Sequence, residues 1–227
     1  MSELTTIARS ELITIHKNVL QGSNEWHELR SGKFTSSKAN TIATAGKGLV
    51  TYVSEILEPH VCGNISPRFQ GSADTQRGNM LEPIARTMYA FETGRMVREV
   101  AFVQAGDFIG VSPDGLVGDD GLVEIKCRNN AKHIAIALQG EPSKEAYMQM
   151  QMQMLVTGRQ WCDFIAYNPY VMGKPLIIQR IFPDEKAFAK LLNGLEKGIA
   201  MLERGWELFN TESELIDIEL PIDEAAF

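Results

Sequence analysis

Cysteine and histidine are scarce in this chain of 227 residues, and neither is arranged to bind a metal or to form a cross-link. The three cysteines, Cys62, Cys127 and Cys162, form no CxxC pair, and their number is odd. This pattern argues against a disulfide framework and a structural zinc site, and it favours free thiols in a reducing compartment. The four histidines have no metal-ligand spacing, so we expect packing or surface roles for them.

Long apolar runs and low-complexity segments are also missing. No apolar stretch is long enough to span a membrane, and residues 1–10 lack the apolar core of a signal peptide. No internal repeat and no Pro-, Gly- or Ser-rich linker divides the chain. We therefore expect one cytoplasmic domain that buries a sizeable core and makes no membrane contact.

An excess of basic residues, the usual mark of a protein that binds nucleic acid, is absent, because the net charge is −7. The negative charge is concentrated at the end of the chain. No basic residue follows Arg204, and residues 207–227 contain seven acids, which leaves 22 acidic and 22 basic residues in 1–206. The sequence therefore predicts a neutral domain over 1–206, still able to bind DNA, and an acidic tail over 207–227. The tail alternates acids with apolar residues, which suits a sheet edge, a basic partner or simple repulsion of DNA.

The apolar pattern changes period along the chain and predicts a mixed α/β core. Residues 144–158, "KEAYMQMQMQMLVTG", alternate Gln and Met like a strand, but Met, Gln, Leu and Ala favour a helix and a glycine ends the segment. Helices are predicted over 26–31, 35–44, 49–61, 79–94, 144–158 and 185–204. Strands are predicted over 102–110, 122–127, 162–167 and 175–182.

The stretch "VSPDGLVGDDGLVEIKC", residues 111–127, places Asp114 before a glycine-rich turn and Glu124 and Lys126 after it. Lys126 leaves the same face of the strand as Glu124, because side chains alternate in a strand. Two carboxylates and the Ile125 carbonyl are oxygen ligands of the kind that Mg²⁺ prefers, and a lysine beside them can orient an attacking water. The plain alternative is a β-hairpin with a solvated face. Asp119 and Asp120 are read as turn formers, in the stretch "GDDG".

Three further stretches carry a resemblance to a known family. Pro113-Asp114 followed by Glu124-Ile125-Lys126 looks like the PD-(D/E)xK nuclease motif. The stretches "EWHELRSGKFTSSKA", "GNMLEPIAR" and "QMQMQMLVTG", at 25–39, 78–86 and 149–158, resemble motifs of the lambda exonuclease family, also called the YqaJ-type viral recombinases. The resemblance covers residues 25 to about 200 and leaves out the acidic tail. It implies a restriction-endonuclease-like core, in which helices flank a central mixed β-sheet.

The resemblance also implies roles for individual residues. Glu82 would approach a second metal ion, although a glutamate near a helix start also favours the helix dipole. A pocket for a 5′-phosphate would contain Arg30, Ser37, Ser112 and Gln151, with Lys132 as a weaker candidate because arginine is expected at that position. Ser37 has an alternative reading as a helix N-cap.

The activity that the resemblance implies is metal-dependent 5′→3′ digestion of one strand of linear double-stranded DNA to mononucleotides. The expected cofactor is Mg²⁺, in a pair of ions that Mn²⁺ can replace. The expected partners are DNA ends, two further copies of the chain in a trimeric ring, and a single-strand annealing protein. Two alternatives stay open: a catalytically silent module that binds DNA ends or a recombinase, and a RecB-like or Cas4-like nuclease of other polarity. The basic residues expected to face the channel of the ring are Arg68, Arg77, Lys126 and Lys132.

Overall fold

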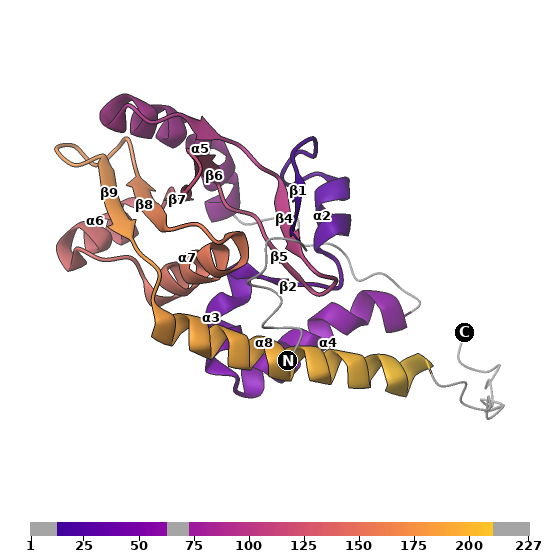
Figure 1. Ribbon diagram of the computed structural model, residues 1–227. Coiled ribbons are helices and arrows are strands. Elements are labelled where there is room, and N and C mark those ends of the chain that lie inside the picture. The colour runs from indigo at the N-terminus through magenta and orange to yellow at the C-terminus, as the bar shows by residue number, and fades with distance from the viewer. Residues whose placement is uncertain (1–12, 63–72, 211–227) are drawn as a thin grey trace, which may run out of the picture.

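A computed structural model describes residues 13–62 and 73–210, which form two mixed β-sheets flanked by helices (Figure 1). The first sheet has the order β1-β4-β5-β2, in which only β5 and β2 are parallel neighbours. Its strands are β1 (Ile13–His16), β2 (Phe34–Thr35), β4 (Phe102–Ala105) and β5 (Ile109–Val111). The mixed α/β architecture is confirmed, but the single central sheet of the prediction is two sheets.

The second sheet carries the predicted hairpin and has the order β3-β6-β7-β8-β9. Strands β7 and β8 are parallel, and all the other neighbours are antiparallel. Its strands are β3 (Val97–Arg98), β6 (Gly115–Val117), β7 (Gly121–Lys126), β8 (Trp161–Tyr167) and β9 (Leu176–Ile181).

Helices cover both sheets, and none of them, within the described part of the chain, is long and apolar enough to cross a membrane. The first helices are α2 (Asn24–Arg30), the 3₁₀ helix η2 (Ser36–Lys38), α3 (Ala39–Thr44) and α4 (Lys47–Val61). The others are α5 (Ala73–Thr93), α6 (Asn130–Gln139), α7 (Lys144–Thr157) and α8 (Glu185–Asn210).

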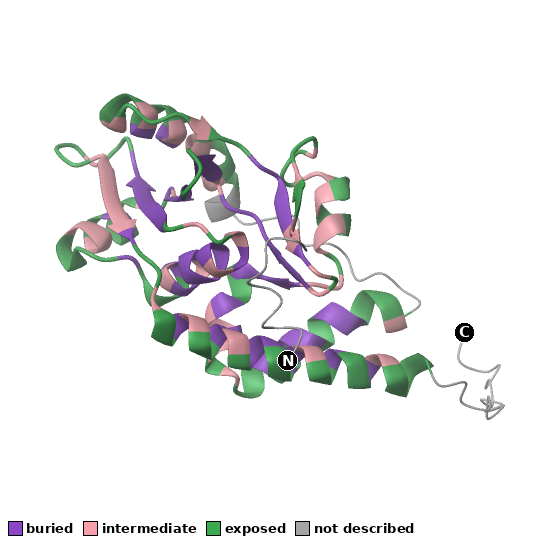
Figure 2. Cartoon of the chain, viewed as in Figure 1, coloured by how far each residue is buried: buried purple, intermediate pink, exposed green. Residues whose placement is uncertain are grey.

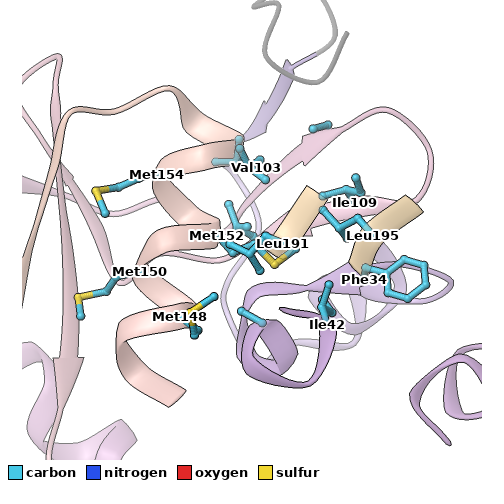
Figure 3. Close-up of a cluster of buried hydrophobic side chains, with 14 of the residues drawn as sticks. Phe34, Ile42, Val103, Ile109, Met148, Met150, Met152, Met154, Leu191 and Leu195 are labelled. Atoms are coloured by element: carbon cyan, nitrogen blue, oxygen red, sulfur yellow. The ribbon is translucent and has the colours of Figure 1, made fainter. Parts of the chain in front are cut away.

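Helix α7 runs through the centre of the larger core, where it is almost entirely buried (Figure 2). This confirms that the Gln/Met alternation forms a helix. A helix that contacts neighbours all round needs no polar face, so strict alternation does not conflict with it. Figure 3 shows Met152 pointing toward Leu191 of α8, and Met150 and Met154 pointing the other way.

Strand β7 separates two cores. Val123 and Ile125 point into a smaller core that also contains Ala85 and Tyr89 of α5. Because side chains alternate along a strand, the intervening Glu124 points to the opposite face, toward α7. The site is therefore built on a strand that is held from both sides.

Several predicted elements differ from the structure. The predicted strand 102–110 is a hairpin of β4 and β5, because Gly106, at φ 61°, turns the chain so that Ala105 pairs with Ile109. Strand β1 and helix α6 were not predicted. The signals for α6 were present in the sequence: Asn129 caps its start by accepting a hydrogen bond from the backbone N–H of Lys132, and Gly140 ends it in the left-handed conformation.

The first residues of the predicted acidic tail lie in a helix. Helix α8 continues to Asn210, so Glu207 belongs to its last turn. Residues 211–227, which make up the rest of the tail, lie outside the described residues, as does Arg68. All three cysteines are free, as predicted.

The packing of α8 on α3 tests the fold. A Cβ added at Gly194 would lie 1.9 Å from the carbonyl oxygen of Ile42, so one backbone must move to accept it. We expect Gly194→Ala to lower the free energy of unfolding by about 3 kcal/mol, the cost of overpacking a core. Gly78→Ala is the matched control, because a Cβ there meets no atom within 4 Å and should stabilise α5 by about 0.5–1 kcal/mol. Urea denaturation of both variants distinguishes these outcomes, and equal midpoints would contradict the close approach.

Candidate active site

The predicted hairpin brings its two acids together. Asp114 lies in the connection from β5 to β6, and its Oδ2 accepts a 2.6 Å hydrogen bond from the backbone N–H of Ile125. Ile125 lies next to Glu124 in β7, so this bond holds the Asp114 carboxyl beside that of Glu124. Burial raises the pKa of Asp114, and the charge of the neighbouring Glu124 carboxylate raises it further.

Both oxygens of Glu124 have partners. The side chain is fully buried, its Oε1 pairs with the ammonium of Lys126, and its Oε2 accepts a 2.7 Å hydrogen bond from Gln153 Nε2. The ammonium of Lys126 also donates to Gln149 Oε1 at 3.2 Å. A buried carboxylate needs such partners, and together they fix its orientation.

Glu82 approaches the same acids from α5. Its Oε1 pairs with Arg86 at 2.7 Å, and Arg86 also pairs with Glu99 at 2.6 Å. The helix begins at Ala73, so Glu82 lies well beyond its first turn. The helix-dipole explanation for this residue is therefore wrong, because that effect is confined to the terminal turn.

The site carries more negative charge than its own cations balance. Burial raises the pKa of Asp114 well above its usual range, and the carboxylates of Glu124 and Glu82 add to this effect. Burial likewise raises the pKa of Glu82 and outweighs the opposing effect of Arg86, and the carboxylates of Glu124 and Glu99 add to the rise. A divalent cation would relieve these unfavourable energies, so the site fits a metal bound by carboxylates.

The residues suit a hard cation that keeps part of its water shell. No group of three or more His, Cys, Asp or Glu side chains in the described ranges is close enough to form a metal site alone. Mg²⁺ needs no such cage, because one or two carboxylates with waters and substrate phosphate suffice. Burial lowers the pKa of Lys126, but Glu124 and Asp114 outweigh this, so the lysine stays protonated.

A second polar cluster surrounds Arg30 at the end of α2. Its guanidinium donates to Ser112 Oγ at 3.2 Å, to Thr35 Oγ1 at 3.4 Å and to Ser37 Oγ at 3.5 Å. The structure therefore brings together three of the residues predicted for the phosphate pocket. None of the acids in the described ranges pairs with Arg30, and burial lowers its pKa, so an incoming anion would be favourable here.

Three further residues, none of which was assigned to the pocket from the sequence, hold this cluster in place. The Trp26 ring lies 4.2 Å from the Arg30 guanidinium, and its Nε1 donates to Ser112 Oγ at 3.1 Å. Tyr52 OH accepts a 2.9 Å hydrogen bond from the backbone N–H of Thr35. Only the Thr-x-Ser pattern hinted at Thr35, whereas Tyr52 comes from α4 and had no local signal.

Gln151 makes its side-chain hydrogen bonds with the turn between β9 and α8. Its Nε2 donates to the carbonyl of Phe182 at 2.9 Å, and its Oε1 accepts from the backbone N–H of Asp184 at 2.9 Å. Both ends of the amide thus join α7 to the turn between β9 and α8. Gln149 and Gln153 contact Lys126 and Glu124 instead. Their spacing of four residues, which puts them on one helix face, was the available signal.

Lys132 is also separate from the Arg30 cluster. It lines a cavity of about 300 Å³ between α6 and α7, together with Lys126 and Arg128. This places it on another side of the acids, where a cation can still contact a DNA phosphate.

A buried network on the other face of the second sheet holds α5 in place. Asp163 of β8 accepts a 2.7 Å hydrogen bond from Tyr89 OH. It also accepts two hydrogen bonds, of 2.8 and 2.9 Å, from the guanidinium of Arg180. Tyr89 follows Glu82 by seven residues, which is about two helical turns, so both lie on the same face of α5. The network therefore fixes the position from which Glu82 approaches the other acids.

Comparisons with known proteins identify the family and agree with the fold. A family model described as the YqaJ-like viral recombinase domain matches residues 25–160. The alkaline exonuclease LHK-Exo of Laribacter hongkongensis is 37% identical over 82% of this chain and 95% of its own, with a TM-score of 0.75, and its complex with dAMP matches equally well. A phage-related exonuclease of Haemophilus somnus 129PT, 17% identical over 78% of this chain and 98% of its own, shares the fold with a TM-score of 0.60. Among curated proteins, nothing matches.

Stability without metal tests the charge excess. The folded pKa of Asp114 is raised, so ionising it costs stability as the pH rises above the unfolded value of about 3.9. We expect Asp114→Asn, in EDTA at pH 8, to raise the melting temperature by about 3 °C, the shift that roughly 1 kcal/mol gives in a domain of this size. The gain should vanish toward pH 3, where the wild-type carboxyl is protonated. Asp119→Asn, at an exposed carboxyl, is the control; equal gains in both variants would contradict a special cost at Asp114.

Proposed function

The chain belongs to the YqaJ-like viral recombinase family, and we propose that it is a Mg²⁺-dependent 5′→3′ exonuclease that digests one strand of linear double-stranded DNA. Family membership implies nuclease activity on DNA. The proposal adds the polarity, the metal and the product, which is a 5′-mononucleotide. The surviving 3′ single strand would then serve recombination by strand annealing.

One observation carries the proposal: acids from β7, from α5 and from the β5–β6 connection act on one another beside a protonated lysine, and the same connection also contacts an arginine surrounded by three hydroxyl groups. Asp114, Glu124 and Glu82 supply the negative charge that attracts metal ions. Arg30 supplies a site for an anion, and its partner Ser112 is only two residues from Asp114. A DNA end offers both phosphate groups that such a pair of sites would hold.

In this function, Asp114, Glu124 and the carbonyl of Ile125 hold the metal, and Glu82 holds a second ion or its water. Bound Mg²⁺, for which Mn²⁺ can substitute, supplies electrostatic stabilisation of the attacking and leaving oxygens. Lys126, being protonated, donates a hydrogen bond that orients the attacking water. The water oxygen bonds to phosphorus and gives up a proton to solvent, the bond from phosphorus to the 3′-oxygen of the terminal nucleotide breaks, and that oxygen takes up a proton from solvent.

The Arg30 cluster selects the end of the strand. A terminal 5′-phosphate carries more charge than a phosphodiester, and a guanidinium with hydroxyl donors suits its oxygens. Thr35 joins Arg30, Ser37 and Ser112 in this role, because its hydroxyl contacts both Arg30 and Ser37. Lys132 contacts a phosphate elsewhere in the bound DNA.

Partners complete the proposal. A neutral domain has little long-range attraction for DNA, so a closed ring of three copies would retain the duplex by enclosing it. Arg77, Lys126 and Lys132 would face the channel of this ring, and a single-strand annealing protein would receive the surviving strand.

Removal of either metal-binding acid tests the activity. We expect Asp114→Ala and Glu124→Ala to reduce the release of nucleotides from linear duplex in Mg²⁺ at least about 10³-fold, because each removes part of a preorganised electrostatic site. Asp119→Asn should keep wild-type rates. Ca²⁺ should support DNA binding without cleavage, since its looser coordination positions water poorly. Wild-type rates in either alanine variant, with folding intact, would refute the assignment.

A preference for 5′-phosphorylated ends tests the polarity. We expect wild type to digest a 5′-phosphorylated duplex at least about tenfold faster than the same duplex without the phosphate, and Arg30→Ala to lose this preference. Arg204→Ala, at an exposed arginine of α8, should retain it. Initial rates on the matched duplexes give the ratio. Equal ratios for wild type and Arg30→Ala would remove this pocket from the mechanism.

A further inference from the structure

A groove of about 830 Å³ lies between α5 and the start of α6 and shares no residue with the Arg30 cluster. Helix α5 forms one wall, and the start of α6 with the β8–β9 connection forms the other. Two of its lining residues are close in sequence to residues of the site. Leu81 directly precedes Glu82, and Asn129 follows Lys126 by three positions. The groove is therefore lined by residues that adjoin, along the chain, both Glu82 of α5 and the end of β7.

The lining of the groove has the chemistry of a nucleotide site. Tyr170 presents an aromatic ring that is 70% exposed, and Met80 adds an apolar surface that is 75% exposed. The side chains of Gln76 and Asn130 offer amides for base edges, and the wall also contains an arginine but no acidic residue. Aromatic platforms combined with positive charge are what sequence-tolerant binding of single strands requires.

The wall that contains Tyr170 is held rigid by a buried asparagine. Asn168 is fully buried, and its Nδ2 donates to the carbonyl of Arg128 at 3.0 Å and to Asn130 Oδ1 at 2.9 Å. Its Oδ1 accepts a 3.0 Å hydrogen bond from the backbone N–H of Tyr170. These bonds order the Tyr170 segment and the start of α6 before any ligand arrives, which reduces the entropy lost on binding.

We infer that this groove binds the digested DNA strand on the 3′ side of the cleaved bond, with an unpaired base stacked on Tyr170. The inference rests on the proposed exonuclease function. There the terminal nucleotide lies between the Arg30 cluster and the acids, so the rest of the strand must continue over another surface. The cavity beside Lys132 is smaller and is lined by three basic residues, which suits a phosphate. The groove offers the aromatic and amide surfaces that a base needs once its pairing is lost.

A fluorescent base tests the stacking. We place 2-aminopurine second from the 5′ end of a phosphorylated duplex and bind the full-length protein in Ca²⁺. Wild type should quench the fluorescence by stacking the base. Tyr170→Ala should leave it bright and bind the duplex about tenfold more weakly, whereas Tyr170→Phe should behave like wild type. In Mg²⁺, Tyr170→Ala should raise KM about tenfold with little change in kcat.

Met172→Ala is the matched control, because Met172 lies in the same connection, is 96% exposed and does not line the groove. It should match wild type in every measurement. If wild type releases no nucleotides, the proposed function itself fails. If wild type is active and Tyr170→Ala matches it in fluorescence and KM, only the groove assignment is overturned. Light scattering gives the mass of each variant in solution. If Tyr170→Ala has a lower oligomeric mass than wild type, the groove assignment is overturned, because Tyr170 would then belong to an interface between subunits.

Discussion

Repulsion between three carboxylates is the constraint on which the rest of this structure depends. Burial raises the pKa of Asp114 and of Glu82, and the charge of Glu124 adds to both shifts, so ionising these two acids beside Glu124 is unfavourable. Each acid is held by a separate donor: a backbone N–H, a buried lysine with a glutamine, and an arginine. The network of Asp163 with Tyr89 and Arg180 on the far face of the sheet serves the same end, since it keeps α5 in position. The fold thus stores an unfavourable charge arrangement that a cation relieves.

Helix α7 supports the site through glutamines that point to two opposite sides of the helix. Gln149 and Gln153 contact the lysine and the glutamate of β7, while Gln151 faces away and ties the helix to the turn before α8. The methionines fill the space between, where their flexible side chains suit an irregular core. A repeated Gln-Met pattern therefore supplies polar groups on two sides of a buried helix, at the cost of having no solvent face.

The parts of the site that are local in sequence could be predicted, and the parts that depend on tertiary contact could not. The segment from Asp114 to Lys126 is a hairpin whose alternation fixes the side-chain directions, so the sequence was enough to place it. Arg30 was assigned by resemblance, and its contacts with hydroxyl groups agree with that reading. Gln151 was also assigned by resemblance, but its hydrogen bonds to the turn before α8 could not be predicted, because the period of the sequence does not tell which face of a buried helix meets which neighbour. Tyr52 was missed because its contact with Thr35 spans 17 residues of the sequence and joins two different elements.

The connection from β5 to β6 joins the two halves of the site within three residues. Ser112 contacts Arg30, Asp114 lies with the acids, and the carbonyl of Pro113 between them accepts a 3.2 Å hydrogen bond from Gln21. An extended chain advances about 3.3 Å per residue, so the two side chains leave the backbone only about 7 Å apart. In the proposed function, a terminal phosphate at one end and a cleavable phosphodiester at the other must then be close neighbours along one strand. Covalent geometry, with the rigid φ of proline between the two ligands, would set the length of the product. The length of the product would then be fixed without any motion of one part of the domain against another.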